Sequence, residues 1–309
     1  MPLVGELAAL ATALLWSGTS IFFSEAGKRI GAFRVNKIRL AMAAVLYATV
    51  LLVRTGMPLP TGVGTEAILW LSLSSFIGIV IGDSLLFKAF ILIGPRLTTL
   101  IFASSPILAT VIAWFFLDEK LGWFDLAGVI ITLAGIGWVV FERQFNGAQG
   151  RSRTGYATEG KDFALGVLCS FGGALGQAAG LVTSKQGMLG TGQVVPPLEA
   201  SFVRILFALA AMWLISAARG QWKQTFAVWK DRTALWLTFG GTVIGPFLGI
   251  WLSLVAVSYI EAGVAATLMA MVPVLVIPLV VILHKEKVSF RAVFGAVVAV
   301  GGVALIFLH

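Results

Sequence analysis

The 309-residue chain carries few charges for its size: 22 Lys/Arg and 14 Asp/Glu amount to 12% of the sequence, against 59% apolar residues and a mean hydropathy of +0.97. Soluble domains carry about 25% charged residues, so these values exclude a water-soluble fold and place most of the chain in lipid. The net charge of +8 is spread along the sequence without a basic cluster interleaved with aromatics, which argues against nucleic acid as a partner.

Ten apolar windows follow one another along the chain. A helix needs about 20 mainly apolar residues to cross the roughly 30 Å hydrocarbon core, and these windows are apolar on every side, which favours helices over barrel strands. They cover residues 3–24, 35–53, 67–93, 97–117, 123–141, 163–184, 200–218, 233–259, 263–283 and 290–308. We therefore expect an all-α integral membrane protein with ten transmembrane helices.

The longest polar stretch, residues 142–162, separates two sets of five expected helices. Its Gly, Ser and Thr residues are typical of a connecting segment. The expected organisation is a first five-helix repeat at 1–141 and a second at 163–309, joined by this linker.

The two halves share an internal repeat. A shift of 167 residues superimposes Gly78 on Gly245, Pro106 on Pro273, Glu119 on Glu286, Lys120 on Lys287, Gly128 on Gly295 and Gly135 on Gly302. Matches of Gly, Pro and charged residues in fixed order indicate duplication. Because five is an odd number of spans, the second half enters the membrane from the opposite side, giving inverted repeats around a central cavity. Pro246 falls opposite Ile79, which predicts a kink in the second copy alone.

Small residues recur at four-residue spacing in three of the expected helices. These stripes comprise Ser74, Gly78 and Gly82, then Gly172, Gly176 and Gly180, then Gly241, Gly245 and Gly249. Such spacing predicts close approach of helix backbones, and the same surfaces could slide or hinge during a transport cycle.

Two sequence blocks carry a family resemblance. They run from Pro106 through Asp118-Glu119-Lys120-Leu121 to Gly135, and from Pro273 through Lys285-Glu286-Lys287-Val288 to Gly302. Arg39 and Arg204, near the starts of the second and seventh helices, also fit the pattern. With these features the chain resembles the ten-helix EamA-type members of the drug/metabolite transporter superfamily, which includes bacterial amino-acid and metabolite exporters.

The resemblance implies a transporter in the inner (plasma) membrane that moves a small molecule by alternating access and needs no cofactor. By this analogy helices 1, 3, 4, 6, 8 and 9 face the cavity, and helices 5 and 10 are peripheral or form a homodimer interface. The implied substrate is an amino acid or a related metabolite moved outward. A facilitator or antiporter of phosphorylated or nucleotide-linked sugars is the alternative.

Two ionisable residues, Asp83 and Lys88, fall inside the third expected helix. A charge at mid-membrane costs about 2.5–3.5 kcal/mol on insertion scales, so each needs a partner or a purpose. For Asp83 the structural interpretation is an ion pair with Arg39, and the functional one is recognition of a cation or a proton-coupling site. For Lys88 the choice is between a snorkelling anchor and a positive lining that attracts a carboxylate or phosphate.

The candidate substrate-binding residues combine these two charges with polar and aromatic side chains on the presumed cavity helices. They are Trp16, Ser20, Asp83, Phe87, Lys88, Thr99, Phe102, Gln177, Trp251, Tyr259 and Met269. Under the 167-residue shift Asp83 and Lys88 correspond to Ile250 and Val255, so the cavity is expected to be electrostatically lopsided. Such a cavity suits an amphiphilic or zwitterionic solute.

A membrane-embedded enzyme is the competing class of function. It would need a cluster of nucleophile, base or metal ligands, whereas the spans contain no paired carboxylates and no mid-membrane histidine. The single Cys169 excludes an internal disulfide and any multi-cysteine metal site. We expect a protein that is not an enzyme and holds no metal.

The orientation in the membrane receives two opposed predictions. Lys and Arg gather in the odd-numbered connectors, while the even-numbered ones contain only Arg54, Lys120 and Lys185. The positive-inside rule therefore puts the odd connectors in the cytoplasm and both termini outside. The family resemblance implies the reverse.

Overall fold

The computed structural model describes residues 3–93, 98, 101–146, 160–218, 220, 231–272, 274–275 and 290–307. All secondary structure in these ranges is helical. The predictions for Thr99, Pro273 and residues 276–289 fall outside the described residues, as does the side chain of Ser20.

The first half is a run of apolar helices. Its elements are α1 (Val4–Ile30), α2 (Ala32–Thr55), α3 (Thr65–Ser75), the π-helix η1 (Phe76–Gly82), α4 (Asp83–Leu92), α6 (Ser105–Leu117) and α7 (Trp123–Asn146). The segments α3, η1 and α4 follow one another without a break and form a single rod. Helical hydrogen bonding satisfies the backbone within each segment, as a lipid environment demands.

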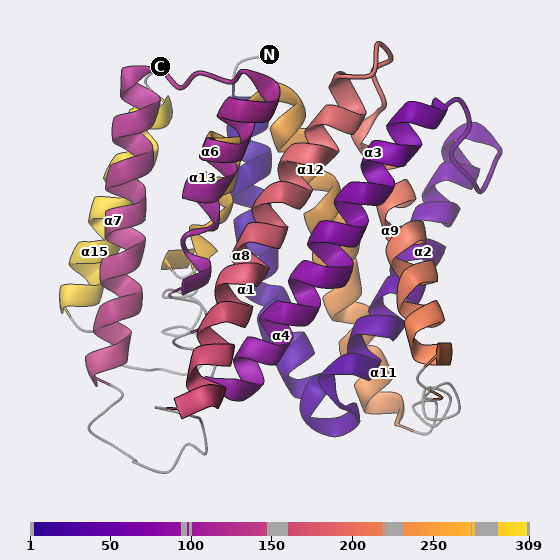
Figure 1. Cartoon of the computed structure of the whole chain (residues 1–309), viewed down its shortest axis with the longest axis horizontal. Helices are drawn as coiled ribbons and strands as arrows, with labels where there is room; N and C mark the ends of the chain where they lie inside the picture. The colour runs from indigo at the N-terminus through magenta and orange to yellow at the C-terminus, as the bar shows by residue number, and fades with distance from the viewer. Residues whose placement is uncertain are drawn as a thin grey trace.

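The second half repeats this order. Its elements are α8 (Gly160–Leu189), α9 (Pro197–Ala218), α11 (Arg232–Thr242), the π-helix η4 (Val243–Gly249), α12 (Ile250–Tyr259), α13 (Ala262–Met269) and α15 (Phe290–Phe307). Both chain ends lie at the same end of the molecule (Figure 1). An even number of crossings produces this placement, in agreement with the ten expected spans.

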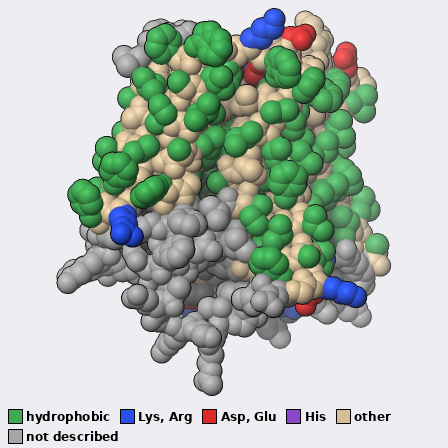
Figure 2. All heavy atoms as spheres, turned by 60° about the vertical axis from the view of Figure 1, so that its left-hand side comes forward, with side chains coloured by type: hydrophobic (Ala, Val, Ile, Leu, Met, Phe, Trp, Pro, Cys, Tyr) green, Lys and Arg blue, Asp and Glu red, His purple; other side chains and the backbone are tan. Residues whose placement is uncertain are grey.

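Five described helices are long and apolar enough to cross a membrane, and four shorter ones are also apolar. Large apolar side chains remain exposed along their flanks, among them Trp123 at 87% and Trp236 at 72%. On the face in Figure 2, hydrophobic side chains cover the flank while the charged side chains lie toward the ends of the helices. Such a belt is the surface that a lipid bilayer solvates.

The repeat extends to the local geometry of the backbone. Adding 167 to the bounds of α3, η1 and α4 gives the bounds of α11, η4 and α12 at every residue. The change in helical hydrogen bonding is therefore not confined to the copy with Pro246, because η1 has the same π-helical turn without a proline. The π-helical turn belongs to the duplicated fold, and the proline is an addition to it. Turns of this kind often mark functional positions in helices.

Each half contributes its first helix to the π-helical rod of the other half. Helix α8 lies against α3, η1 and α4, while α1 lies against α11, η4 and α12. At the first of these contacts a Cβ atom on Gly180 would lie 2.9 Å from Cα of Gly78, and one on Gly176 would lie 2.8 Å from Cα of Gly82. The small-residue stripes thus bring two backbones together across the repeat boundary.

Helices α7 and α15 pack together as a pair at one side of the molecule (Figure 1). Their equivalent glycines, Gly135 and Gly302, each face the backbone of the partner helix. Among the described elements, α7 also touches α13. The pair is peripheral, as the resemblance implies, and the homodimer remains an expectation.

Two boundaries differ from those expected. The polar linker shrinks to at most residues 147–159, because α7 continues to Asn146 and α8 begins at Gly160. Helix α8 also continues to Leu189, so Lys185 lies within a helix and not in the connector where its charge suggested. A carboxylate from the other half makes this position tolerable, as described below.

Candidate functional site

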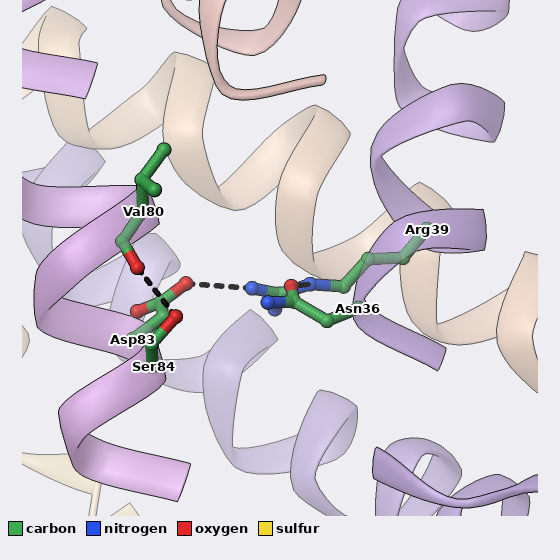
Figure 3. Close-up of polar contacts among 5 residues, drawn as sticks. All are labelled: Asn36, Arg39, Val80, Asp83 and Ser84. Atoms are coloured by element: carbon green, nitrogen blue, oxygen red, sulfur yellow. Dashed lines mark hydrogen bonds and ion pairs between the residues drawn. The ribbon is translucent and has the colours of Figure 1, made fainter. Parts of the chain in front are cut away.

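The Arg39–Asp83 pair lies within the bundle between α2 and α4 (Figure 3). Nη2 of Arg39 donates to Oδ2 of Asp83 at 2.6 Å, and Nε donates to Oδ1 of Asn36 at 2.7 Å. The Arg39 side chain is 4% exposed and that of Asp83 is 22% exposed. The rings of Phe23 and Phe87 lie 5.4 and 5.7 Å from the guanidinium, which adds cation–π contact. The structure therefore brings Asp83, Phe87 and Arg39 into one cluster.

The position of Asp83 follows from the π-helical turn, since it is the first residue of α4 after η1. The hydroxyl of Ser84 donates to the carbonyl of Val80 inside η1 (Figure 3). In the second half, the hydroxyl of Tyr47 donates to the carbonyl of Phe247 at 2.7 Å. Val80 and Phe247 are 167 residues apart, so both copies hold the same carbonyl with a side-chain hydroxyl, from a different helix in each case.

Arg204 on α9 is the repeat counterpart of Arg39. The two arginines are 165 residues apart, as are the first residues of their helices, Ala32 and Pro197. Arg204 is only 7% exposed, and its Nε has no hydrogen-bond partner among the described residues. Its Nη2 lies 3.6 Å from the point where a side chain on Gly78 would begin. The two arginines thus differ sharply in how their charges are compensated.

Both arginines lie inside their helices, about two turns from the first residue. Each is seven residues into its helix, which corresponds to about 10 Å along the axis. Helices α2 and α9 begin at opposite ends of the molecule (Figure 1), so the two arginines are set back from opposite ends of the bundle. Asp83 is the counterpart of Ile250, so the second half has no carboxylate at this position, and Asp83 interacts electrostatically with Arg204 as well as with Arg39.

An aromatic cluster surrounds the second π-helical turn. The ring of the fully buried Tyr47 stacks on Phe202 at 5.8 Å and meets Phe247 edge-on at 4.9 Å. Trp251 follows at 6.2 Å from Phe247. Trp251, one of the sequence candidates, is thereby tied to η4 and half-buried. Tyr47 was not among the candidates from the sequence. The chain has only three tyrosines, and the place of Tyr47 within an expected span was the signal that could have identified it.

The remaining candidates are spread over the bundle. Trp16 lies against η4, since a Cβ on Gly249 would be 2.9 Å from its Nε1. Tyr259 is 60% exposed at the end of α12, beside Gly5. Phe102 and Met269 are half-buried, whereas Lys88 and Gln177 are exposed. The structure therefore gathers Asp83 and Phe87 around Arg39 and leaves Lys88, Gln177 and Tyr259 apart from them.

A second ion pair links the two halves at the end of the molecule where the termini lie. Oε1 of Glu119, just after α6, is 2.6 Å from Nζ of Lys185 on α8. Oε2 accepts a hydrogen bond from the backbone N–H of Ala262 at 2.8 Å, and Nζ of Lys185 donates to the carbonyl of Ile260 at 2.6 Å. The carboxylate thus also caps the N-terminus of α13, where a negative charge is favoured. Both side chains are about 85% buried, with exposures of 13% and 15%.

Breaking this ion pair is expected to loosen that end of the bundle. Glu119→Gln removes the charge but keeps an acceptor for Ala262 N–H, so the change isolates the link to Lys185. In a Cys169→Ala background, a cysteine at Thr110, which packs against Gly263 between α6 and α13, reports opening. Loss of a charged hydrogen bond should raise its labelling rate by a water-soluble maleimide about 10-fold.

The matched control is Asp118→Asn, which removes the neighbouring acid at an exposed position. This change should leave the labelling rate unaltered. Equal rates for Glu119→Gln and the unmodified chain, or equal acceleration by both variants, would contradict the role assigned to the pair. The repeat match at Glu119 was the sequence signal that could have identified it.

Within the described ranges, no group of three or more His, Cys, Asp or Glu side chains could hold a metal ion. The chemistry that the arrangement offers is ionic and apolar recognition within the membrane. Two cations and one anion, flanked by aromatic rings, form a region suited to binding a small amphiphilic solute.

Comparison with known proteins shows similarity over nearly the whole chain. The model of the EamA-like transporter family matches residues 3–141 and 164–308. One solved structure, described only as "Crystal structure of protein", has a TM-score of 0.74 at 20% identity and covers 98% of this chain and 96% of that one. No curated protein matches the sequence. The structural likeness supports the fold, and the family match covers both halves.

Proposed function

Because the chain belongs to the EamA-like transporter family, we propose that it exports a small zwitterionic metabolite, such as an amino acid, across the inner membrane by alternating access. Membership makes it a multi-pass membrane transporter and not an enzyme. The class of substrate, the outward direction and the cycle are the proposed part.

The observation that carries the proposal is the unequal charge of two otherwise matching halves. Rods α3-η1-α4 and α11-η4-α12 have the same breaks, yet one presents Asp83 where the other presents Ile250. With Arg39 and Arg204, one carboxylate and two buried guanidinium groups interact electrostatically within the bundle. A solute with both an anionic and a cationic group matches such a site better than a neutral one.

The alternating cycle is supported by the way the halves interlock. Helix α1 lies against the second rod and α8 against the first, with glycine contacts that allow short sliding movements. The Glu119–Lys185 pair closes one end of this arrangement. A cycle that rocks one helix set against the other would open and close such a link once per turnover.

Counterflow in proteoliposomes tests the proposal. Vesicles loaded with an unlabelled solute and diluted into the labelled solute are expected to show a transient accumulation that protein-free vesicles lack. The panel should contain amino acids, their amides, and phosphorylated and nucleotide-linked sugars. Accumulation confined to the sugars would favour the alternative substrate class, and absence of flux for every compound would refute the proposal.

Direction is tested separately in cells. Overproduction of an exporter is expected to increase secretion of the metabolite and resistance to its toxic analogues. A fused C-terminal reporter resolves the orientation at the same time, because its activity differs between the two sides of the membrane. Increased uptake without increased secretion would contradict the outward direction.

A further inference from the structure

We propose that Arg204 is the anchor for an anionic group of the transported solute, a carboxylate or a phosphate. The inference rests on the proposed transport function and deepens it by naming the group recognised and the residue that recognises it. It starts from the different surroundings of the two repeat-related arginines.

The first step concerns compensation of charge. Arg39 has Asp83 at 2.6 Å and Asn36 at 2.7 Å, and its guanidinium is thereby paired. Arg204 also lies within electrostatic reach of Asp83, which is already paired with Arg39, but it forms no ion pair of its own within the described part of the chain, and its buried Nε lacks an acceptor. A guanidinium taken out of water carries a large desolvation penalty unless a partner offsets it. An anionic ligand would supply that partner.

The second step concerns local geometry. Arg204 is held from behind, because the hydroxyl of Ser75 donates to its backbone carbonyl at 2.6 Å. Its Nη2 lies against η1, 3.6 Å from the point where a Cβ on Gly78 would stand, beside the backbone contact of η1 with α8, and the absence of a side chain at Gly78 gives the buried guanidinium room there. A guanidinium presents several donors in one plane, which suits bidentate binding of a carboxylate or phosphate.

The third step concerns a difference between the two repeats, namely Ile250 in the second at the position of Asp83 in the first. Ile250 packs against the cluster that contains Phe202 and Ile205, the neighbours of Arg204 on α9. The symmetric carboxylate is thus absent from a position adjacent to the arginine. Asp83 interacts electrostatically with both arginines, so two guanidinium groups share one carboxylate and one positive charge is left for a ligand.

Arg204→Gln is the direct test. A charged hydrogen bond accounts for about 10- to 100-fold in affinity, so carboxylate binding and transport should fall by this factor. Transport of the corresponding amide, which lacks the anionic group, should change little. Arg204→Lys should recover only part of the loss, because lysine lacks the bidentate geometry. Arg54→Gln, at an exposed helix end, is the matched control.

Ile250→Asp tests the same inference without removing the arginine. An aspartate there would pair with Arg204 as Asp83 pairs with Arg39, so the variant should fold while losing carboxylate binding. Ile250→Asn, of similar size and uncharged, should keep most of it. This pair of variants covers the case in which Arg204→Gln fails to fold.

Binding is measured apart from flux, by the thermal stabilisation of purified protein with acetate, amino acids, their amides and inorganic phosphate. Carboxylates and phosphate are distinguished by which of them stabilises the unmodified chain and not the variants. Stabilisation that is unchanged by Arg204→Gln and Ile250→Asp overturns the inference, as does the absence of any anion effect. Flux of neutral solutes with no anion effect would overturn it while leaving the transport function intact.

Discussion

Asp83→Leu is expected to lower the free energy of unfolding by about 3 kcal/mol. The change strands the guanidinium of Arg39, which is only 4% exposed, and breaking a buried ion pair from one side costs about 3–5 kcal/mol. We expect the lower end of this range because the Asp83 side chain is 22% exposed to solvent. Unfolding by SDS in mixed micelles, followed by tryptophan fluorescence, measures the difference.

The double variant Arg39→Met with Asp83→Leu should recover most of this loss. Apolar residues of similar volume often replace a buried ion pair without loss of stability, because neither charge then needs desolvation. The difference between the double variant and the sum of the single ones gives the coupling energy. Lys88→Met, an exposed charge on the same helix, is the control and should change stability by less than about 0.5 kcal/mol. Equal loss in the single and double variants would show that the pair does not act as a unit.

Gly180→Val should have an even larger effect, namely loss of the folded monomer. The first carbon of a side chain there would lie 2.9 Å from Cα of Gly78 and 3.1 Å from the carbonyl oxygen of Ser74. Both are backbone atoms and cannot rotate away, so α8 would have to separate from η1. Overpacking costs about 1–3 kcal/mol even where side chains can adjust. Size-exclusion profiles of detergent-solubilised protein would show aggregated material.

Gly137→Val is the matched control for this change. Gly137 lies in the interior of α7, and nothing lies within 4 Å of a Cβ placed there. The same valine therefore alters helix propensity in both variants, and steric clash in only one. If both variants kept the monomer, close contact between α8 and η1 would not be required for folding.

Much of the architecture could be predicted from hydropathy and the repeat, because lipid imposes one rule on every span. Uniformly apolar windows must become helices, and an odd number per half must invert the second half. The family and the all-helical fold predicted from these patterns are confirmed. The limits of the windows were less accurate where a charge interrupted them. Lys185 reads as a boundary in the sequence and lies inside α8, because Glu119 neutralises it from a distant part of the chain.

Backbone breaks were harder to predict, because sequence signals for π-helical turns are weak. Pro246 pointed to a break in the second copy, whereas η1 forms the same π-helical turn from Phe76 to Gly82 with Ile79 at the position of the proline. A π-helical turn changes the rotation of the following residues about the helix axis, and therefore which side chains face the inside of the bundle. The site could not be assembled from α-helical periodicity for this reason. Asp83 and Arg39 could be matched by depth alone. The exposed positions of Gln177 and Lys88 could not.

The hydroxyl contacts also escaped sequence analysis. Ser84 serves the Val80 carbonyl from within its own rod, whereas Tyr47 reaches the Phe247 carbonyl from a helix 200 residues away. The two hydroxyl groups bind equivalent carbonyl groups from unrelated sequence positions, so no shared sequence motif marks them. The same holds for Arg204, since its significance lies in the missing counterpart of Asp83.

The crossed packing of α1 and α8 has a consequence for synthesis. Helix α1 ends at Ile30, but the rod against which it lies begins at Arg232, about 200 residues later. At a translation rate of about 5–20 residues per second, the ribosome needs about 10–40 s to deliver that partner. During this interval α1 is in the membrane before the glycines that Thr19 and Phe23 contact in the folded protein have been synthesised. Insertion of the first helix and completion of its packing are therefore separate events, and the first half alone lacks the surface that holds its own leading helix.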